Sequence, residues 1–484
     1  MDPSLELDLS AAPPGQRLSS LHAALRDAIA SGRLAAGLRL PSSRELAARV
    51  GVSRNTAVAA YELLAAEGWL LARGSAGSYL ADLPRATAHR PERAQIAPWA
   101  DRALTTAATA NSAPDHRPAP THSFNTGVPD LSRFPFEVLR RLQTRALQAA
   151  ARAPAVYAPA QGLQALRAAL AGHASSSRAV ACSADDVLVT AGAQQAFDLI
   201  ARVLVTPGRT VAAVEDPGYL PLRAALRAAG ARLAPVPVDR EGLVVAALPR
   251  DARIVCVTPS HQFPLGVPLS LARRRELLNW AAQRQAVIIE DDYDGEFRFS
   301  GRPLDALQTL DRDGRVFYVG TLSKSMLPAL RLGYLVAPAW AQPALLAAKQ
   351  AADGGSPALT QAAVADFIAE GHLLRHVRRM RAEYAERRGV LEQLLRRHLG
   401  EAADIYPAIA GLHLAVGLPG DAAALARRAR AVGVAVETLG RYRLDATDQC
   451  PAADADGLVL GLGLLTPARL PEAVRRLARA FGSR

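Results

Sequence analysis

The run from Thr321 to Arg331 places one lysine between hydroxyl side chains and an arginine. Lysine occurs at only two positions of the chain, 324 and 349, although Lys and Arg together number 57. Because nearly every ordinary cation is arginine, Lys324 indicates a role for a primary amine that loses its proton and condenses with an aldehyde. Thr321, Ser323 and Arg331 can bind a phosphate through hydroxyl groups and a bidentate guanidinium. The run therefore predicts a Schiff-base site for pyridoxal 5'-phosphate (PLP).

Both lysines also have a simpler interpretation. Lys324 would fit a surface lysine near a helix start, since short motifs carry a false-positive risk. Lys349 lies in an apolar helical run, and we interpret it as such a surface lysine. The reactive role of Lys324 is favoured by the buried strand expected over 316–320, because α/β sheets place their ligands at strand ends.

The elements that must position Lys324 follow from residue 123 onward, where short apolar runs alternate with helical segments. This alternation is typical of a parallel sheet with helical crossovers. Candidate strands cover 186–190, 209–214, 231–236, 253–257, 286–289 and 315–319. Polar residues follow several of them. The sequence thus predicts an α/β fold with its site at the strand ends.

Two strand ends carry groups suited to the ring of PLP. One carboxylate of the run Glu290-Asp-Asp-Tyr-Asp can keep the pyridine nitrogen protonated, so that the ring acts as an electron sink, and Tyr293 can hydrogen-bond the ring oxygen. A metal site is the alternative for this acidic run, but Mg²⁺ or Ca²⁺ would not account for the nearby lysine and phosphate-binding residues. Tyr219 can stack on the ring, or else it is an aromatic residue of the core.

A small-residue turn follows the strand expected over 186–190. The backbone N–H groups of Gly192, Ala193 and Gln194 open a helix there and suit a phosphate. A tight strand-to-helix turn without a ligand explains the same residues equally well.

Residues 16–81 have the pattern of a separate unit. Apolar spacing predicts a helix over 16–31, and Ser42 and Glu45 have capping-box spacing for a second helix that ends at Val50. Gly51 makes a turn, and Ser53 can cap a third helix over 54–67. Two helices joined by a glycine turn form a helix-turn-helix, whose second helix begins with residues that can reach base edges. A small helical bundle is the alternative.

The third helix is expected to turn Val58, Tyr61, Leu63 and Leu64 inward. After it, the run 68–80 has apolar residues on both sides of a glycine-rich tip, which predicts two strands and a wing. Arg73 could meet phosphate or the minor groove from this wing.

The linker composition, the cysteines and the net charge narrow the class of protein. Residues 83–121 are rich in Ala, Pro, Arg, His and Thr, which predicts a semi-extended linker between a unit over 14–82 and one over 122–484. The three cysteines are far apart, which argues against a structural zinc site or a disulfide scaffold and suits the cytoplasm. No run is long enough to cross a membrane. The formal net charge of +12 is compatible with a polyanionic partner.

Taken together, these motifs resemble a known family. Residues 16–81 resemble the GntR-type winged helix, and the region from 123 resembles a fold-type I aminotransferase domain. The combination is similar to the MocR-type regulators, in which the two are fused. The motifs that carry the resemblance are Thr190-Ala-Gly-Ala-Gln-Gln, Glu215-Asp-Pro-Gly-Tyr, Thr258-Pro-Ser-His-Gln-Phe-Pro, Glu290-Asp-Asp-Tyr-Asp and Ser323-Lys.

The resemblance implies a role for individual residues. Lys324 would be the Schiff-base lysine, with Asp291 at the pyridine nitrogen, Tyr293 at the ring oxygen, Tyr219 stacked on the ring, and His261 and Gln262 near it. The implied phosphate contacts are Gly192, Ala193, Gln194, Thr321 and Arg331, with Ser323 beside them. The implied DNA contacts are Arg44, Ser53, Arg54, Asn55, Thr56 and Arg73. Tyr157 would reach the phosphate of the other subunit, so the resemblance implies a homodimer.

One departure from the aminotransferase pattern concerns the substrate carboxylate. The arginine that usually binds it precedes the last core strand, but 458–463 is apolar here. Arg441 or Arg443 could substitute for that arginine. We expect a transcription regulator that binds double-stranded operator DNA and senses PLP itself, or an amino compound that forms an external aldimine with PLP. A working aminotransferase with an appended DNA-binding domain, and a regulator with a vestigial, cofactor-free domain, are the alternatives.

Overall fold

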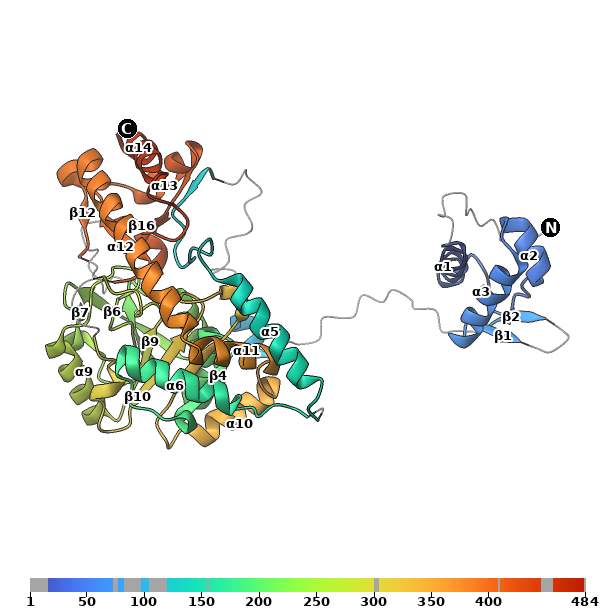
Figure 1. The fold of residues 1–484 in the computed structure, drawn as a ribbon, viewed down its shortest axis with the longest axis horizontal. Coiled ribbons are helices and arrows are strands. Elements are labelled where there is room, and N and C mark those ends of the chain that lie inside the picture. Colours follow the sequence, from blue (N-terminus) through green and yellow to red (C-terminus); the bar gives the residue numbers. More distant parts are fainter. Residues whose placement is uncertain are drawn as a thin grey trace. The chain divides into compact units, whose positions relative to one another are not determined.

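The computed structural model describes residues 16–72, 77–81, 97–103, 120–154, 156–299, 304–407, 410–444 and 456–482. The chain divides into two compact units, 1–95 and 96–484 (Figure 1). The expected linker lies mostly outside the described residues. In the parts that are described, no helix is long and apolar enough to cross a membrane.

The N-terminal unit has the three expected helices and the two strands of the wing. They are α1 (Arg17–Ala30), α2 (Ser43–Val50), α3 (Arg54–Ala66), β1 (Leu70–Ala72) and β2 (Ser78–Leu80). The capping box is confirmed, because Ser42 accepts from the backbone N–H of Glu45 while the Glu45 carboxylate accepts from that of Ser42. Gly51 ends α2 with a φ of +67°, a conformation that glycine adopts without steric cost.

The inward face of α3 is partly corrected by the structure. Ala57, Ala60 and Leu64 are fully buried, whereas Leu63 is 43% exposed. Leu63 directly precedes Leu64, and adjacent residues of a helix cannot both point to the same face. The wing strands pair antiparallel, Leu71 opposite Tyr79, as predicted. Arg73 lies outside the described residues.

The C-terminal unit is built on an eight-stranded sheet of order β4-β11-β10-β9-β8-β5-β6-β7. Five neighbouring strands, β10, β9, β8, β5 and β6, run parallel, and β11 is antiparallel to both β10 and β4. The strands are β4 (Val187–Thr190), β5 (Val211–Asp216), β6 (Arg232–Asp239), β7 (Gly242–Leu243), β8 (Ala252–Val257), β9 (Val287–Asp292), β10 (Val316–Thr321) and β11 (Gly333–Val336). All six predicted strands are therefore confirmed, with shifts of up to three residues at their ends.

Helices cover both faces of this sheet, because alternate residues of each strand are buried on opposite sides. On β10, Phe317 and Val319 pack with α7 (Ala193–Leu204) and α8 (Leu220–Ala229), whereas Val316 packs with α9 (Leu271–Arg284). Further helices of the unit are α5 (Phe136–Ala150), α6 (Gln164–Arg178), α10 (Gln342–Asp353) and α11 (Ala358–Ala369). The α/β fold predicted from the strand–helix alternation is confirmed.

A smaller sheet of order β12-β13-β16-β15 completes the unit. Its strands are β12 (Asp404–Ile405), β13 (His413–Gly417), β15 (Glu437–Thr438) and β16 (Gly457–Gly461). The long helix α12 (His372–Leu399) runs from the large sheet to this smaller one, where α13 (Ala422–Ala431) and α14 (Leu470–Gly482) lie (Figure 1). A two-stranded pair, β3 (His122–Ser123) with β14 (Val434–Ala435), attaches the start of the unit to the same region.

Candidate functional site

A cavity of about 330 Å³ lies where the carboxyl ends of the large sheet meet the smaller sheet. Lys324 follows β10, and Tyr293 and Asp294 follow β9. The lining residues are Thr126, Gly127, Tyr219, Leu220, Pro221, Phe263, Tyr293, Asp294, Lys324, Leu412, His413, Glu437, Arg441 and Tyr442. The cavity thus brings together segments that are up to 316 positions apart in the sequence, as the Thr126–Tyr442 contact shows.

Lys324 has few partners in this cavity. Its Nζ donates a hydrogen bond of 2.5 Å to the carbonyl oxygen of Gly127. Burial lowers the pKa of Lys324, against the opposing influence of Asp294 and Asp291. Desolvation favours the neutral amine, which is the nucleophilic form. Gly127 has a φ of +70°, and a Cβ there would lie 3.0 Å from Nζ, so the close approach of Lys324 suits glycine.

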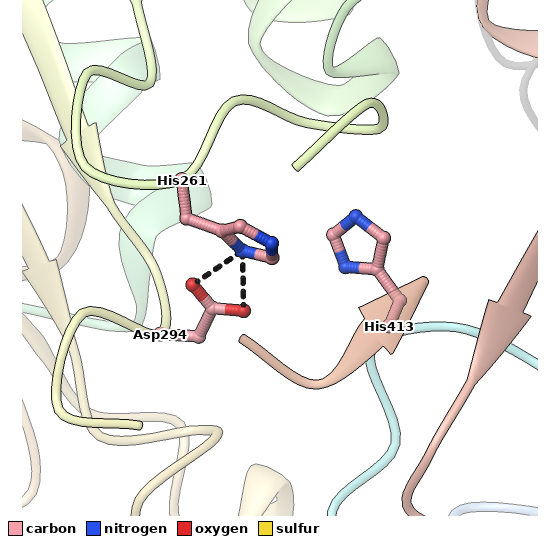
Figure 2. A group of neighbouring side chains, drawn as sticks. All are labelled: His261, Asp294 and His413. Atoms are coloured by element: carbon pink, nitrogen blue, oxygen red, sulfur yellow. Dashed lines mark hydrogen bonds and ion pairs between the residues drawn. The ribbon is translucent and has the colours of Figure 1, made fainter. Parts of the chain in front are cut away.

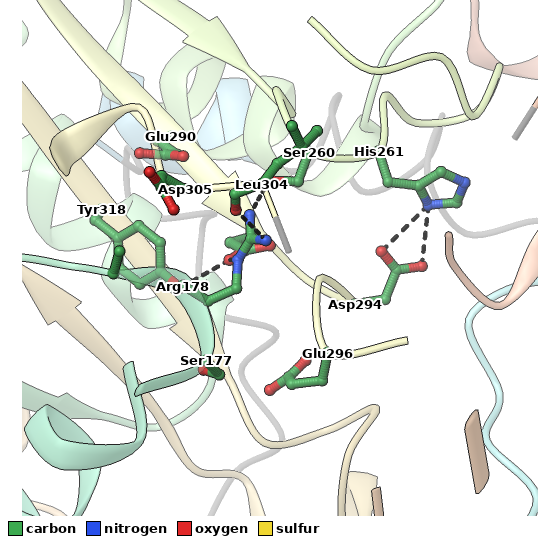
Figure 3. Close-up of polar contacts among 12 residues, drawn as sticks. Ser177, Arg178, Ser260, His261, Glu290, Asp294, Glu296, Leu304, Asp305 and Tyr318 are labelled. Atoms are coloured by element: carbon green, nitrogen blue, oxygen red, sulfur yellow. Dashed lines mark hydrogen bonds and ion pairs between the residues drawn. The ribbon is translucent and has the colours of Figure 1, made fainter. Parts of the chain in front are cut away.

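The three acidic residues that end β9 differ in their hydrogen bonds. Glu290 accepts from the backbone N–H groups of Leu307 and Gln308. Asp292 accepts from Arg178 at 2.6 Å and from Tyr318 at 2.8 Å. Figure 3 shows Arg178 between Tyr318 and the segments that carry Ser260 and Leu304, which its other nitrogens contact. These two acids therefore hold the scaffold together.

Asp291 differs from its neighbours, because both of its carboxylate oxygens are buried and neither has a hydrogen-bond partner among the described residues. Burial, followed by the charges of Asp292, Asp294 and Glu215, raises the pKa of Asp291 well above its ordinary value. A buried, unpaired carboxylate is costly unless a donor or cation meets it. A protonated pyridine nitrogen is such a donor, so the position of Asp291 fits the ring of PLP.

The predicted phosphate residues gather at the start of α7. Gly192 precedes the helix with a φ of +78°, and a Cβ there would lie 3.3 Å from Nη2 of Arg331. That same Nη2 donates to the carbonyl oxygen of Ala191 at 3.0 Å. Ala193 is the first residue of α7, and the Gln194 side chain donates to the Pro221 carbonyl oxygen. A helix N-terminus beside a guanidinium is a site for a phosphate dianion.

Two hydroxyl groups lie just before Lys324, because Thr321 ends β10 and Ser323 follows it. Thr321 donates to the hydroxyl of Ser323 at 3.1 Å, and the backbone N–H of Ser323 donates to Thr321 Oγ1 at 3.2 Å. Thr321 is buried and Ser323 partly exposed. The turn thus presents both hydroxyls on the segment that ends in the lysine.

Aromatic and imidazole groups form the side of the cavity near His261. Tyr219 packs edge-on against Phe263, with ring centroids 5.5 Å apart. The hydroxyl of Tyr293 donates to the carbonyl oxygen of His261 at 3.0 Å and lies 2.9 Å from its Nδ1. In this structure, then, the hydroxyl that the sequence analysis assigned to the PLP ring oxygen is turned toward His261.

His261, Asp294 and His413 form a buried cluster whose possible ligand atoms lie within 4.8 Å of one another. Figure 2 shows His261 contacting the Asp294 carboxylate on one side while His413, from β13, faces it on the other. Nδ1 of His261 lies 3.2 Å from both oxygens of Asp294. Nε2 of His413 donates to the Pro264 carbonyl oxygen, and burial lowers the pKa of His413 to about 3. His413 is therefore neutral at physiological pH.

Lys349 corrects the sequence analysis, because it is fully buried and not at the surface. Its Nζ pairs with Asp353 one helical turn later, at 2.6 and 2.7 Å. Asp353 also accepts from the side chain of Gln195 at 2.8 Å, and the backbone N–H of Ala191 donates to Gln195 at 2.8 Å. The second lysine therefore supports, through two side chains, the turn that carries the phosphate residues. We call Lys349, Asp353 and Gln195 the support network.

The two arginines considered for an effector carboxylate are placed differently. Arg441 lines the cavity, with 44% of its side chain exposed, and lies 3.8 Å from Glu437. Arg443 is not among the lining residues. Tyr157, which the resemblance expects to contact the phosphate in the other subunit, is fully exposed.

The expected DNA contacts that the structure describes lie on α2 and around the start of α3. Arg44 on α2 and Arg54 and Asn55 at the start of α3 are exposed. Ser53 caps α3 by accepting from the backbone N–H of Thr56 at 3.1 Å, and their hydroxyls lie 2.8 Å apart. The cap and the expected contacts Arg54 and Asn55 thus share one turn, so the start of α3 is held in place.

Several cavity residues escaped the sequence analysis. Thr126, Gly127, Glu437 and Tyr442 come from the start and the end of the unit, and no local motif marks them. Asp294 had a signal, because it ends the Glu290-Asp-Asp-Tyr-Asp run. His413 had none, since it lies in a buried strand of the smaller sheet.

Comparisons with known proteins agree with both units. Residues 18–80 match the family of bacterial regulatory proteins of the gntR family, and residues 122–447 match aminotransferase class I and II. The probable rhizopine catabolism regulatory protein MocR of Rhizobium meliloti is 37% identical over 99% of this chain and 96% of its own length. The regulator TauR of Rhodobacter capsulatus is 37% identical over 97% of this chain and 98% of its own.

Solved aminotransferases share the fold of the larger unit. The α-aminoadipate aminotransferase LysN of Thermus thermophilus, solved with N-(5'-phosphopyridoxyl)-L-leucine, is 30% identical over 74% of this chain and 91% of its own, with a TM-score of 0.67. The kynurenine aminotransferase of Pyrococcus horikoshii is 26% identical over 80% of this chain and 94% of its own, with a TM-score of 0.68. The chain therefore belongs to the MocR-type regulators, in which a gntR-family DNA-binding unit is joined to an aminotransferase class I and II domain.

Proposed function

We propose that this chain regulates transcription by binding an operator through its winged helix while a PLP molecule at Lys324 senses a small effector. The observation that carries the proposal is the unpaired carboxylate of Asp291. It lies near Lys324, whose pKa is lowered by burial. Burial of a carboxyl group without a hydrogen-bond partner lowers stability, so a vestigial domain would be expected to lose it.

Each residue of the site has a separate task in this proposal. Lys324 supplies the amine that holds the cofactor, and Asp291 accepts a hydrogen bond from the ring nitrogen. The backbone of Gly192, Ala193 and Gln194, with Arg331, Thr321 and Ser323, binds the phosphate. Tyr219 covers the ring, while Tyr293 and His261 lie at its edge. When bound, PLP supplies an aldehyde and an electron-withdrawing ring. The effector is PLP itself or an amine that reaches it.

The winged helix binds double-stranded DNA with the start of α3 in the major groove. Arg44, Arg54, Asn55 and Thr56 are the proposed contacts, together with Ser53 and, from the wing, Arg73. A regulator of this kind works in the cytoplasm, where the chromosome is. The exposed positions of Arg44 and Arg54 support the assignment.

A homodimer completes the site in this proposal. Tyr157 is fully exposed, and Val156 beside it is 79% exposed, which is unusual for an apolar residue next to an aromatic one. Contact with the phosphate of a second subunit would bury both side chains. Sedimentation at falling protein concentration measures this association, and a monomer with full PLP occupancy would contradict it.

The function is tested by measuring two activities on the same protein. Operator binding is followed by mobility shift, and PLP binding by the absorbance of the cofactor. Arg54→Ala and Arg44→Ala should each weaken specific DNA binding by about 1–3 kcal/mol and leave the PLP absorbance intact. Arg26→Ala, an exposed change on α1, is the matched control. Unchanged operator affinity in both variants would remove the recognition role from these arginines.

A further inference from the structure

The cavity that contains Lys324 also contains a carboxylate that PLP does not need. Glu437 begins β15 and pairs directly with Val459 of β16. Residues directly opposite in an antiparallel pair point to the same face of a sheet. Val459 is fully buried among Phe263 and Tyr442, two residues of the cavity wall. Beside β16, where an arginine for a carboxylate was expected, the cavity is therefore lined by an acid, Glu437.

Glu437 is held in place by hydroxyl groups on one of its oxygens only. Its Oε2 accepts from Thr126 at 2.7 Å and from the hydroxyl of Tyr442. Its Oε1 has Arg441 at 3.8 Å, which is an ion-pair distance and too long for a hydrogen bond. Among the residues that the structure describes, no donor reaches Oε1 within hydrogen-bond distance. One oxygen is thus fixed, and the other can accept a bond from a ligand.

The charges around the cavity disfavour a second carboxylate. Lys324 and Arg441 are the cations among its lining residues, since His413 is neutral. Lys324 is engaged by the cofactor in the proposed function. Arg441 is half-exposed and its charge is offset by Glu437. A carboxylate placed here would meet Glu437 with no unpaired cation to balance it, and like charges in contact are unfavourable.

We propose that the cavity recognises an amine whose far end donates hydrogen bonds, through an ammonium or a hydroxyl group, and carries no carboxylate. Oε1 of Glu437 accepts the bond from that far end, while the near amine reaches the cofactor at Lys324. Thr126 and Tyr442 fix the direction of the acceptor. This inference rests on the proposed function, because the near amine must find PLP in place.

A series of four-carbon amines tests the inference on the PLP-loaded full chain. The probes are 1,4-diaminobutane, 4-amino-1-butanol, butylamine and 4-aminobutanoate, and the readout is the concentration that half-completes the change in cofactor absorbance. The diamine and the amino alcohol should act at concentrations at least tenfold lower than 4-aminobutanoate, because its carboxylate meets the like charge of Glu437. Both should also act at lower concentrations than butylamine, which has no donor for Oε1 of Glu437. The order of these two probes decides between an ammonium and a hydroxyl donor.

Two variants separate Glu437 from Arg441. Glu437→Gln keeps an acceptor for Thr126 and Tyr442, removes the charge, and should reduce the preference for the diamine over butylamine by about tenfold. Glu276→Gln, an exposed change on α9, is the matched control and should leave the order of probes unchanged. Arg441→Ala should leave the diamine at least as effective as in the unmodified chain.

The contrary outcomes are distinct. If 4-aminobutanoate is the most effective probe and loses its effect in Arg441→Ala, the cavity binds a carboxylate and the inference is wrong. An unchanged order in Glu437→Gln, in a protein with a normal cofactor absorbance, also overturns it. A chain that takes up no PLP at all contradicts the proposed function, and the inference with it.

Discussion

Lys324 and Lys349 are the two lysines of the chain, and their surroundings differ in how polar groups are satisfied. Lys324 has one carbonyl oxygen as its hydrogen-bond partner and lies near the unpaired carboxylate of Asp291. Lys349 is buried in an ion pair with Asp353, which Gln195 completes. The cavity therefore keeps unmet groups for a ligand, while the support network behind it leaves none. The support network therefore contributes to the stability of the fold, whereas the unpaired groups at Lys324 and Asp291 reduce it.

The largest effect is expected from a change of Lys324, which would remove one side of this comparison. Lys324→Ala should abolish the cofactor absorbance, because no other amine lines the cavity among the described residues. Reduction with borohydride followed by mass spectrometry measures the covalent cofactor. A variant that still gave a PLP adduct on the chain would show that the lysine was misassigned.

Next in size is the support network. Lys349→Met should lower the free energy of unfolding by about 2 kcal/mol, because it removes the charge-assisted hydrogen bonds from the buried ammonium to Asp353, whose own side chain is 29% exposed. Chemical denaturation measures this loss. Equal stability of the Lys349→Met protein and the unmodified chain would show that the pair is not structural.

Asp291 should make the stability of the cofactor-free protein depend on pH. The pKa of this carboxyl is raised in the folded protein, so the folded state binds more protons than the unfolded state above about pH 4. Stability of the cofactor-free protein should therefore fall as pH rises from there, by up to about 1.4 kcal/mol per pH unit. In Asp291→Asn this fall should be smaller, and PLP should bind more weakly. Denaturation at pH 5 and pH 8 distinguishes the two proteins.

The smallest effect is expected at Gln195, which connects the support network to the turn at Ala191. Gln195→Met removes the hydrogen bonds to Ala191 and Asp353 and should cost about 1 kcal/mol of stability. It should weaken the affinity for PLP but not for pyridoxal, because the turn that it holds serves the phosphate. Equal weakening of both would place the effect of Gln195 elsewhere in the site. Equilibrium titration of the cofactor-free protein with each compound is the measurement.

How much the sequence could predict depended on the range of the interactions. The capping box at Ser42 and Glu45 and the strands that lead to Asp291 and Lys324 depend on spacing within a few residues, and these predictions are confirmed. Glu437 and Gly127 enter the cavity through distant chain segments, which no local pattern reveals. Lys349 was misjudged because its burial is decided by the neighbours of α10. Asp353 at i+4 was the one local sign of a pair.

Residues 122–127 lead into the cavity wall and are held there by backbone contacts. His122 and Ser123 pair with β14, and a Cβ on Gly461 would lie 2.1 Å from the carbonyl oxygen of Asn125. The chain is thus clamped immediately before Thr126 and Gly127, which contact Glu437 and Lys324. This part of the cavity wall is therefore held before Asn125 by the β3–β14 pair and after it by the contacts with Glu437 and Lys324. Loosening the β3–β14 pair should displace the Gly127 carbonyl oxygen, which is the hydrogen-bond partner of Lys324.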